Sequence, residues 1–204
     1  MNITTRLLSL LLFLPLFGAI HSHADDAAAL DVSEASFDCI REMTPVRGFY
    51  VANLGGDLDA TLAAANAPEG AAYPPGSVVQ LVPGEAMVKH SPGTSPATKD
   101  WEFFELDTSS EGTSIRKRGY ADVVNRFGGN CLACHAQAKP EWDMICEQGH
   151  GCDPIPLTRD MIVLLQKTDP RCEDNPALSE AEIATLQALR QAAEAGAATA
   201  ETTL

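Results

Sequence analysis

The sequence predicts an α+β fold, with strand-forming segments between residues 46 and 119 and a mainly helical part after them. The strand-forming runs are rich in β-branched and aromatic residues, and the later segments have apolar residues at helical spacing. A Pro-Gly turn between two of the runs indicates an antiparallel hairpin. The run 101–107 (WEFFELD) points apolar side chains to both sides, so both faces of the sheet should be covered. Helices can cover one face, and helices or a large flat cofactor can cover the other.

The expected strands have a β-forming composition and are bounded by turn residues. We expect them at 46–53, 77–82, 85–90, 101–107 and 113–119.

Helices are expected where apolar residues recur every three or four positions. These segments are 33–43, 57–67, 120–127, 158–168 and 179–196, together with the cysteine-rich segment between the third and the fourth. The last helix opens with Ser179 and Glu182 at the spacing of a capping box. Because no repeat or long linker divides the chain, residues 25–196 should form one domain, followed by a flexible tail at 197–204.

The N-terminus has the pattern of a secretory signal peptide, residues 1–24. Arg6 precedes an apolar run at 7–20, and small residues lead to an expected cleavage after Ala24. A bilayer span needs about 20 apolar residues, and this run is shorter and contains Pro15 and Gly18. We therefore expect an exported, periplasmic protein without a membrane span after processing, in a compartment where disulfides persist.

The acidic composition narrows the choice of partners. The formal net charge of −14 repels phosphate backbones and argues against nucleic-acid binding. An acidic surface can attract a redox partner that carries a basic docking surface, although such a surface more often serves solubility alone.

The segment 131–135 (CLACH) is the C-x-x-C-H signature of c-type haem attachment. Two thiols three residues apart lie on one flank of a helical turn, where they can add to the two vinyl groups of the porphyrin. The following histidine is then carried under the iron as its proximal ligand. We expect one haem c per chain, held by Cys131 and Cys134, with His135 bound to the iron.

Two other uses of these cysteines remain open. A structural zinc site takes four ligands, usually from two such pairs, and this chain contains only one C-x-x-C. A redox dithiol of the thioredoxin type requires a β-α-β setting, whereas this motif is expected among helices.

The other four cysteines can form two disulfides in an oxidising compartment. We expect a local Cys146–Cys152 pair, which closes a short glycine-containing turn, and a long-range Cys39–Cys172 pair. Free thiols are the alternative.

The sixth coordination position decides what a haem in this chain can do. Met87 and His90 on a strand, His150 in a turn and Met161 on a helix are the candidate ligands. A methionine or histidine there favours one-electron transfer, whereas an open position admits nitric oxide, carbon monoxide or hydroxylamine.

The succession VRGFYVANLGG, YPPGSVVQL, VKH, WEFFELD and CLACHAQA, within residues 46–138, resembles the cytochrome P-460 and cytochrome c-prime-beta family. The resemblance implies an antiparallel sheet flanked by helices, with a c-type haem near the chain's end against one sheet face. It also implies a five-coordinate haem whose distal pocket is shaped by sheet residues, and here Phe103 or Phe104 would form its wall.

One branch of that family carries a lysine bonded to the porphyrin and oxidises hydroxylamine. Lys89 is the nearest match here, with Lys99 second, although a lysine on a strand is usually a solvated edge residue. Residues 139–157 match nothing in the family pattern. The basic run Arg116, Lys117 and Arg118 can neutralise haem propionates or can lie on an exposed strand.

Together these features predict an exported monohaem cytochrome that acts in one-electron transfer. The alternatives are a P-460-like enzyme that oxidises hydroxylamine or nitric oxide, and a gas-binding cytochrome with an open distal site.

Overall fold

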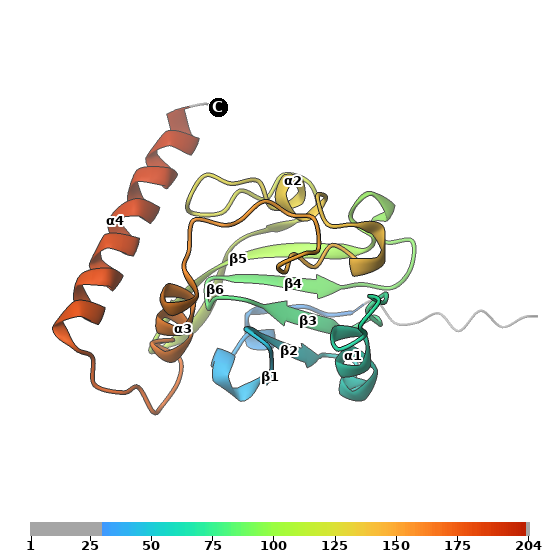
Figure 1. The fold of residues 1–204 in the computed structure, drawn as a ribbon, viewed down its shortest axis with the longest axis horizontal. Coiled ribbons are helices and arrows are strands. Elements are labelled where there is room, and N and C mark those ends of the chain that lie inside the picture. Colours follow the sequence, from blue (N-terminus) through green and yellow to red (C-terminus); the bar gives the residue numbers. More distant parts are fainter. Residues whose placement is uncertain (1–29, 203–204) are drawn as a thin grey trace, which may run out of the picture.

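In the computed structural model, which describes residues 30–202 with side chains through residue 196, a six-stranded antiparallel sheet forms the centre of the molecule (Figure 1). The strands neighbour one another in chain order, as β1 (Thr44–Val46), β2 (Phe49–Asn53), β3 (Ser77–Gln80), β4 (Glu85–Lys89), β5 (Trp101–Ser109) and β6 (Gly112–Gly119). The predicted α+β class with an antiparallel sheet is confirmed. The predicted signal peptide, 1–24, lies outside the described residues.

The predicted strand at 46–53 is in fact the end of β1, a tight turn and β2. Arg47 adopts a left-handed conformation with φ 52°, and the Gly48 amide donates to the Val46 carbonyl. The prediction missed the turn because only two residues separate the apolar Val46 and Phe49, and Arg47 is not a usual turn residue.

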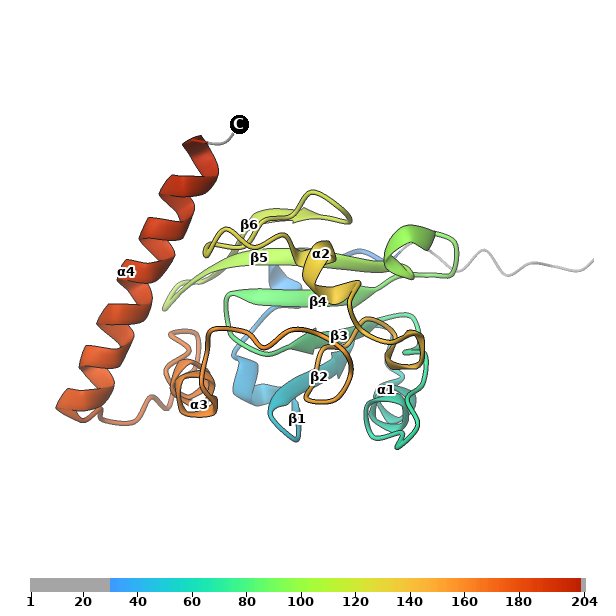
Figure 2. The same ribbon diagram turned by 45° about the horizontal axis from the view of Figure 1, so that its top comes forward.

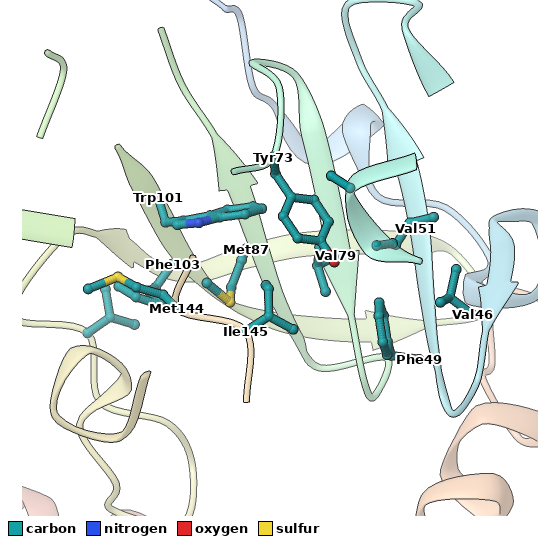
Figure 3. Packing of buried hydrophobic residues seen from close by; sticks show 13 residues of the cluster. Val46, Phe49, Val51, Tyr73, Val79, Met87, Trp101, Phe103, Met144 and Ile145 are labelled. Carbon is teal, nitrogen blue, oxygen red and sulfur yellow. The ribbon is translucent and has the colours of Figure 1, made fainter. Parts of the chain in front are cut away.

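The sheet is buried on both faces, as the 101–107 run predicted. On the face that we call the front, Val79, Met87, Trp101 and Phe103 form one cluster with residues of α1 (Leu58–Ala65) and of segment 139–145, which follows α2. Figure 3 shows Met144 and Ile145 of that segment packed over these side chains.

On the opposite face, which we call the back, a second cluster closes the sheet with the N-terminal segment. Val88, Phe104 and Leu106 pack there against Val32 and Phe37. Chain segments therefore cover both sides of the central strands.

Two predicted helices are wrong. Residues 33–43 form two 3₁₀ turns, Glu34–Ser36 and Ile40–Glu42, because Cys39 and the Ile40 amide are held from outside the segment, by Cys172 and Asp169. Residues 120–127 form an irregular loop.

In that loop the Asn125 side chain accepts hydrogen bonds from the amides of Phe127 and Gly129. An asparagine side chain that bonds nearby amides competes with helix formation.

The remaining helices are α2 (Cys131–His135), α3 (Arg159–Lys167) and α4 (Glu180–Thr202). α4 follows α3 at one end of the sheet and runs six residues beyond the predicted end at 196 (Figures 1 and 2). No helix within residues 30–202 combines the length and the apolar character that a membrane crossing requires.

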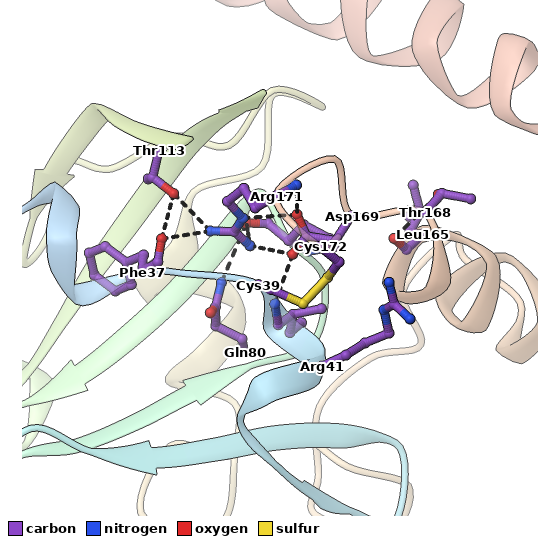
Figure 4. A network of polar contacts seen from close by, with 12 residues as sticks. Phe37, Cys39, Arg41, Gln80, Thr113, Leu165, Thr168, Asp169, Arg171 and Cys172 are labelled. Carbon is purple, nitrogen blue, oxygen red and sulfur yellow. Dashed lines mark hydrogen bonds and ion pairs between the residues drawn. A yellow bond between two sulfur atoms is a disulfide. The ribbon is translucent and has the colours of Figure 1, made fainter. Parts of the chain in front are cut away.

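Both predicted disulfides are present, Cys39–Cys172 and Cys146–Cys152. Around the first, Asp169 and Arg171 form a buried ion pair, and Arg171 also donates to the Phe37 carbonyl and to Thr113 (Figure 4). This network ties the segment after α3 to the N-terminal segment and to β6.

Candidate functional site

α2 carries the C-x-x-C-H motif and lies over the front of β4 and β5 (Figures 1 and 2). Asn130 caps the helix by accepting a hydrogen bond from the Ala133 amide at 2.8 Å, and its side-chain amide donates to the Ala121 carbonyl. The Cys131 amide donates to the Val123 carbonyl. These bonds hold the short helix against the loop that delivers it.

Cys131 and Cys134 are the free cysteines of the chain and are both half-buried. Burial raises the pKa of the Cys131 thiol to about 12, and burial also raises the pKa of Cys134. Both thiols are therefore protonated at neutral pH. A redox dithiol needs a lowered thiol pKa, so this environment disfavours that use.

Two glutamates on the front face, the half-buried Glu85 and the buried Glu105, help to raise the Cys131 pKa. Glu105 is fully buried, and its Oε1 accepts from the Arg126 Nε at 2.7 Å, whereas its Oε2 has no hydrogen-bond partner in the described part of the chain. Burial, followed by the charge of Glu105, raises the pKa of Glu85 to about 7. Two carboxyl groups therefore act on the Cys131 thiol.

His135 is held in one tautomer by a backbone contact. Its Nδ1 lies 2.7 Å from the Met144 carbonyl oxygen, and because that oxygen can only accept, the proton resides on Nδ1. Burial lowers the pKa of His135, so the imidazole is neutral and its Nε2 carries a free lone pair. A neutral imidazole fixed in this way is the usual state of a metal ligand.

Aromatic packing holds the same imidazole. The ring centroids of Phe103 and His135 lie 5.3 Å apart, with the planes tilted by 40°. Phe103 therefore supports the imidazole from the sheet. Phe104 points to the back face and packs against Phe37, with ring centroids 5.0 Å apart. Of the two expected wall residues, Phe103 therefore lies on the same face as His135 and Phe104 lies on the opposite face.

The predicted sixth ligands have other contacts. His90 lies toward the back face, where its Nε2 is 2.8 Å from Glu102 Oε2. His150 is buried, its Nδ1 bonds the Ile145 carbonyl at 2.7 Å, and its ring stacks on Trp142 at 3.7 Å. Met161 lies on α3 and lines a cavity of about 420 Å³ between α3 and α4.

Met87 is the candidate on the same face as His135. It pairs with Phe103 across β4 and β5 and packs in the front cluster with Met144. Its side chain is buried in the apolar packing of that cluster.

The three residues of the basic run 116–118 have three separate acidic partners. Arg118 pairs with Glu102, Arg116 lies 3.4 Å from Glu105, and Lys117 lies 3.7 Å from Asp122. The three side chains do not gather at α2, which favours the alternative of a charged strand.

Asp143, a buried carboxylate in the segment that follows α2, was not predicted from the sequence. Its Oδ1 and Oδ2 lie 2.9 and 2.8 Å from the Lys89 Nζ, and its Oδ2 also accepts from the Tyr73 amide. The one signal in the sequence is a carboxylate between two large apolar residues, Trp142 and Met144.

The donor set fits a covalent haem c better than zinc. The motif presents two unpaired thiols and one imidazole with a free Nε2, as the haem needs. Within the described residues, no three His, Cys, Asp or Glu side chains gather into a group that could hold a metal ion, whereas structural zinc takes four ligands.

Comparison of this chain with protein family models, with curated proteins and with solved structures finds no match in any of the three.

Proposed function

We propose that this chain is an exported c-type monohaem cytochrome that acts in one-electron transfer. The proposal rests on the unpaired thiols and the histidine tautomer of the C-x-x-C-H motif. Cys131 and Cys134 remain unpaired in a chain whose other cysteines form disulfides, and the His135 tautomer leaves Nε2 free. The two disulfides fit an oxidising compartment and so agree with the predicted export.

The two thiols would hold the cofactor by addition to its vinyl groups. In each addition the S–H bond breaks, an S–C bond forms, and the proton ends on the neighbouring vinyl carbon, so no external oxidant is needed. Since both thiols have raised pKa values, they stay as S–H in the folded segment. When bound, haem supplies an iron that gains and loses one electron.

The chain's own residues would orient and shield that iron. His135 would bind it through Nε2, while the Met144 carbonyl fixes the imidazole and Phe103 limits its tilt. The front cluster excludes water from the sheet side, because Trp101 and Phe103 are almost fully buried. The resemblance to the cytochrome P-460 and c-prime-beta family likewise implies a haem that lies against one face of the sheet.

A gas-binding cytochrome with an open distal position is the second candidate. It is favoured because His90, His150 and Met87 are each committed to other contacts. The hydroxylamine-oxidising alternative is disfavoured, since the Lys89 Nζ is bound to Asp143 and to the Lys99 carbonyl. These three acceptor atoms match the three N–H donors of a lysine.

Absorption spectra of the reduced protein, with and without carbon monoxide, test the proposal. We expect a c-type spectrum from protein exported by a host that matures cytochromes c, and its loss in the Cys131→Ala/Cys134→Ala variant. The Cys146→Ala/Cys152→Ala variant is the matched control and should keep the spectrum. A Soret shift on addition of carbon monoxide would indicate an open sixth coordination position. An unchanged spectrum would indicate that a protein ligand fills it. A colourless wild-type protein would refute the proposal.

A further inference from the structure

Lys89 and Asp143 form a buried ion pair between the sheet and the segment that follows α2. Their exposed fractions are 7% and 4%, and the Nζ lies 2.9 and 2.8 Å from the two carboxylate oxygens. The Nζ also donates to the Lys99 carbonyl at 2.6 Å and lies 5.0 Å from the centre of the Trp101 ring. The pair thus joins β4, β5 and segment 139–145.

Asp143 and Met144 both have a backbone conformation that needs external support. Their φ angles are 48° and 68°, in the left-handed region. For residues other than glycine, such a conformation costs on the order of 1–2 kcal/mol each. Two in succession persist only where surrounding contacts hold them in place.

Three successive carbonyl oxygens of this turn each accept from a ring N–H. The Asp143 carbonyl accepts from the Trp101 Nε1 at 2.8 Å, the Met144 carbonyl from the His135 Nδ1 at 2.7 Å, and the Ile145 carbonyl from the His150 Nδ1 at 2.7 Å. The central acceptor, at His135, lies between two anchored peptide groups. Its direction is therefore set by the contacts on either side.

We infer that the Lys89–Asp143 ion pair is a positioning device that aims the Met144 carbonyl at His135 and thereby fixes the tautomer and orientation of the imidazole. Asp143 fixes the turn through both its side chain and its backbone. Its carboxylate accepts from the Lys89 Nζ and the Tyr73 amide, and its carbonyl accepts from the Trp101 Nε1. Lys89 acts here as an internal counter-ion. The part of this inference that concerns iron rests on the proposed function.

The strength of the Nδ1–H···O bond has a chemical consequence for a bound iron. A strong bond makes the imidazole a more basic ligand, which favours the ferric form. Loosening the Met144 carbonyl should therefore raise the reduction potential of the haem. In protein without haem, the same change should let the His135 Nδ1 proton exchange faster with solvent.

A purely structural role is the alternative, because loss of one partner of any buried ion pair destabilises a protein. The back face offers a matched control. Glu102 also has an exposed fraction of 4% and is bound by Arg118 at 2.7 Å, but it lies on the side of the sheet away from His135. Glu102→Gln and Asp143→Asn each remove one buried carboxylate charge.

The experiment compares these two variants with the wild type. Asparagine tolerates a left-handed conformation and can still accept from the Tyr73 amide, so Asp143→Asn mainly removes the charge that binds Lys89. Long-range ¹H–¹⁵N spectra of purified protein report the tautomer of His135 and the exchange of its Nδ1 proton, whether or not haem is attached. Potentiometry of the haem-loaded protein reports the reduction potential.

We expect Asp143→Asn to speed exchange of the Nδ1 proton by about tenfold or more and to raise the reduction potential. Glu102→Gln should lower thermal stability to a similar extent and leave both readouts as in the wild type. The Lys89→Met/Asp143→Asn double variant, which leaves no unpaired lysine charge, should fold more stably than Asp143→Asn and show the same two changes. It keeps the test possible if the single variant does not fold.

An unchanged His135 proton signal and potential in both Asp143 variants would overturn the inference, as would equal changes in Glu102→Gln. If the protein lacks haem but the His135 proton still depends on Asp143, the positioning role stands and the proposed function fails.

Discussion

At the scale of single residues, Glu85 and Glu105 make stability depend on pH. Burial raises the pKa of Glu85 from 4.5 to about 7, with Glu105 as the second cause. The folded state therefore favours protonated Glu85, while the unfolded chain ionises it near pH 4.5. Between these values the unfolded state binds fewer protons, so stability falls as pH rises from about 4.5 to about 7.

Glu85→Gln should remove this dependence. Each pKa unit corresponds to about 1.4 kcal/mol, so ionised Glu85 opposes folding by at most about 3 kcal/mol above pH 7. Urea unfolding should show the variant to be more stable than the wild type at pH 8 and nearly equal to it at pH 4.5. An equal effect at both pH values would contradict the assigned pKa.

The motif residues could be predicted from the sequence because their chemistry depends on local spacing. Cys131, Cys134 and His135 lie within one turn of helix, so their arrangement follows once the helix forms. The roles of His90 and Phe104 depend on which sheet face each side chain occupies. A strand alternates faces, so assigning a face requires the register of the neighbouring strands.

Asp143 could not be predicted for a different reason. Its partners Lys89 and Tyr73 are 54 and 70 residues away in the chain, and its left-handed conformation is held by those partners. No local pattern encodes such a contact.

At the scale of elements, segments that fold by local periodicity were predicted and segments held by distant contacts were not. The hairpin of β3 and β4 and helices α1 and α3 agree with their patterns. The predicted helix at 33–43 fails because long-range bonds hold it in 3₁₀ turns.

The predicted end of α4 at residue 196 is wrong. The residues after it are small and polar and indicated a frayed tail, yet α4 continues to Thr202. A Cβ at Gly196 would lie 2.7 Å from the Phe127 backbone. The glycine therefore allows close approach of the helix to the loop that precedes α2.

The two disulfides should differ in their contribution to stability. Cys39–Cys172 joins residues 133 positions apart, and Cys146–Cys152 joins residues 6 apart. Loop-closure entropy then assigns about 5 kcal/mol to the first and about 2 kcal/mol to the second. Urea unfolding of the two double alanine variants should show this order. The reverse order would indicate that strain or residual structure, and not loop entropy, dominates.

At the scale of the whole molecule, the sheet divides the protein into two sides with different tasks. The back is closed by the N-terminal segment, which Cys39–Cys172 and the Arg171 contacts hold in place (Figure 4). The front holds α2, the free thiols and the turn around Asp143. Figure 3 shows Met144 and Ile145 of that turn packed in the front cluster. Phe103 of β5 and the Met144 carbonyl of the segment after α2 thus both contact His135.

The intact mass of the exported protein shows whether haem is covalently attached to the chain. Material purified from a host that attaches haem to C-x-x-C-H motifs should weigh one haem more than the processed polypeptide, with both disulfides closed. The extra mass should map to the peptide that contains Cys131, Cys134 and His135. A mass equal to the bare polypeptide, from a host that loads a control cytochrome c in parallel, would contradict the account.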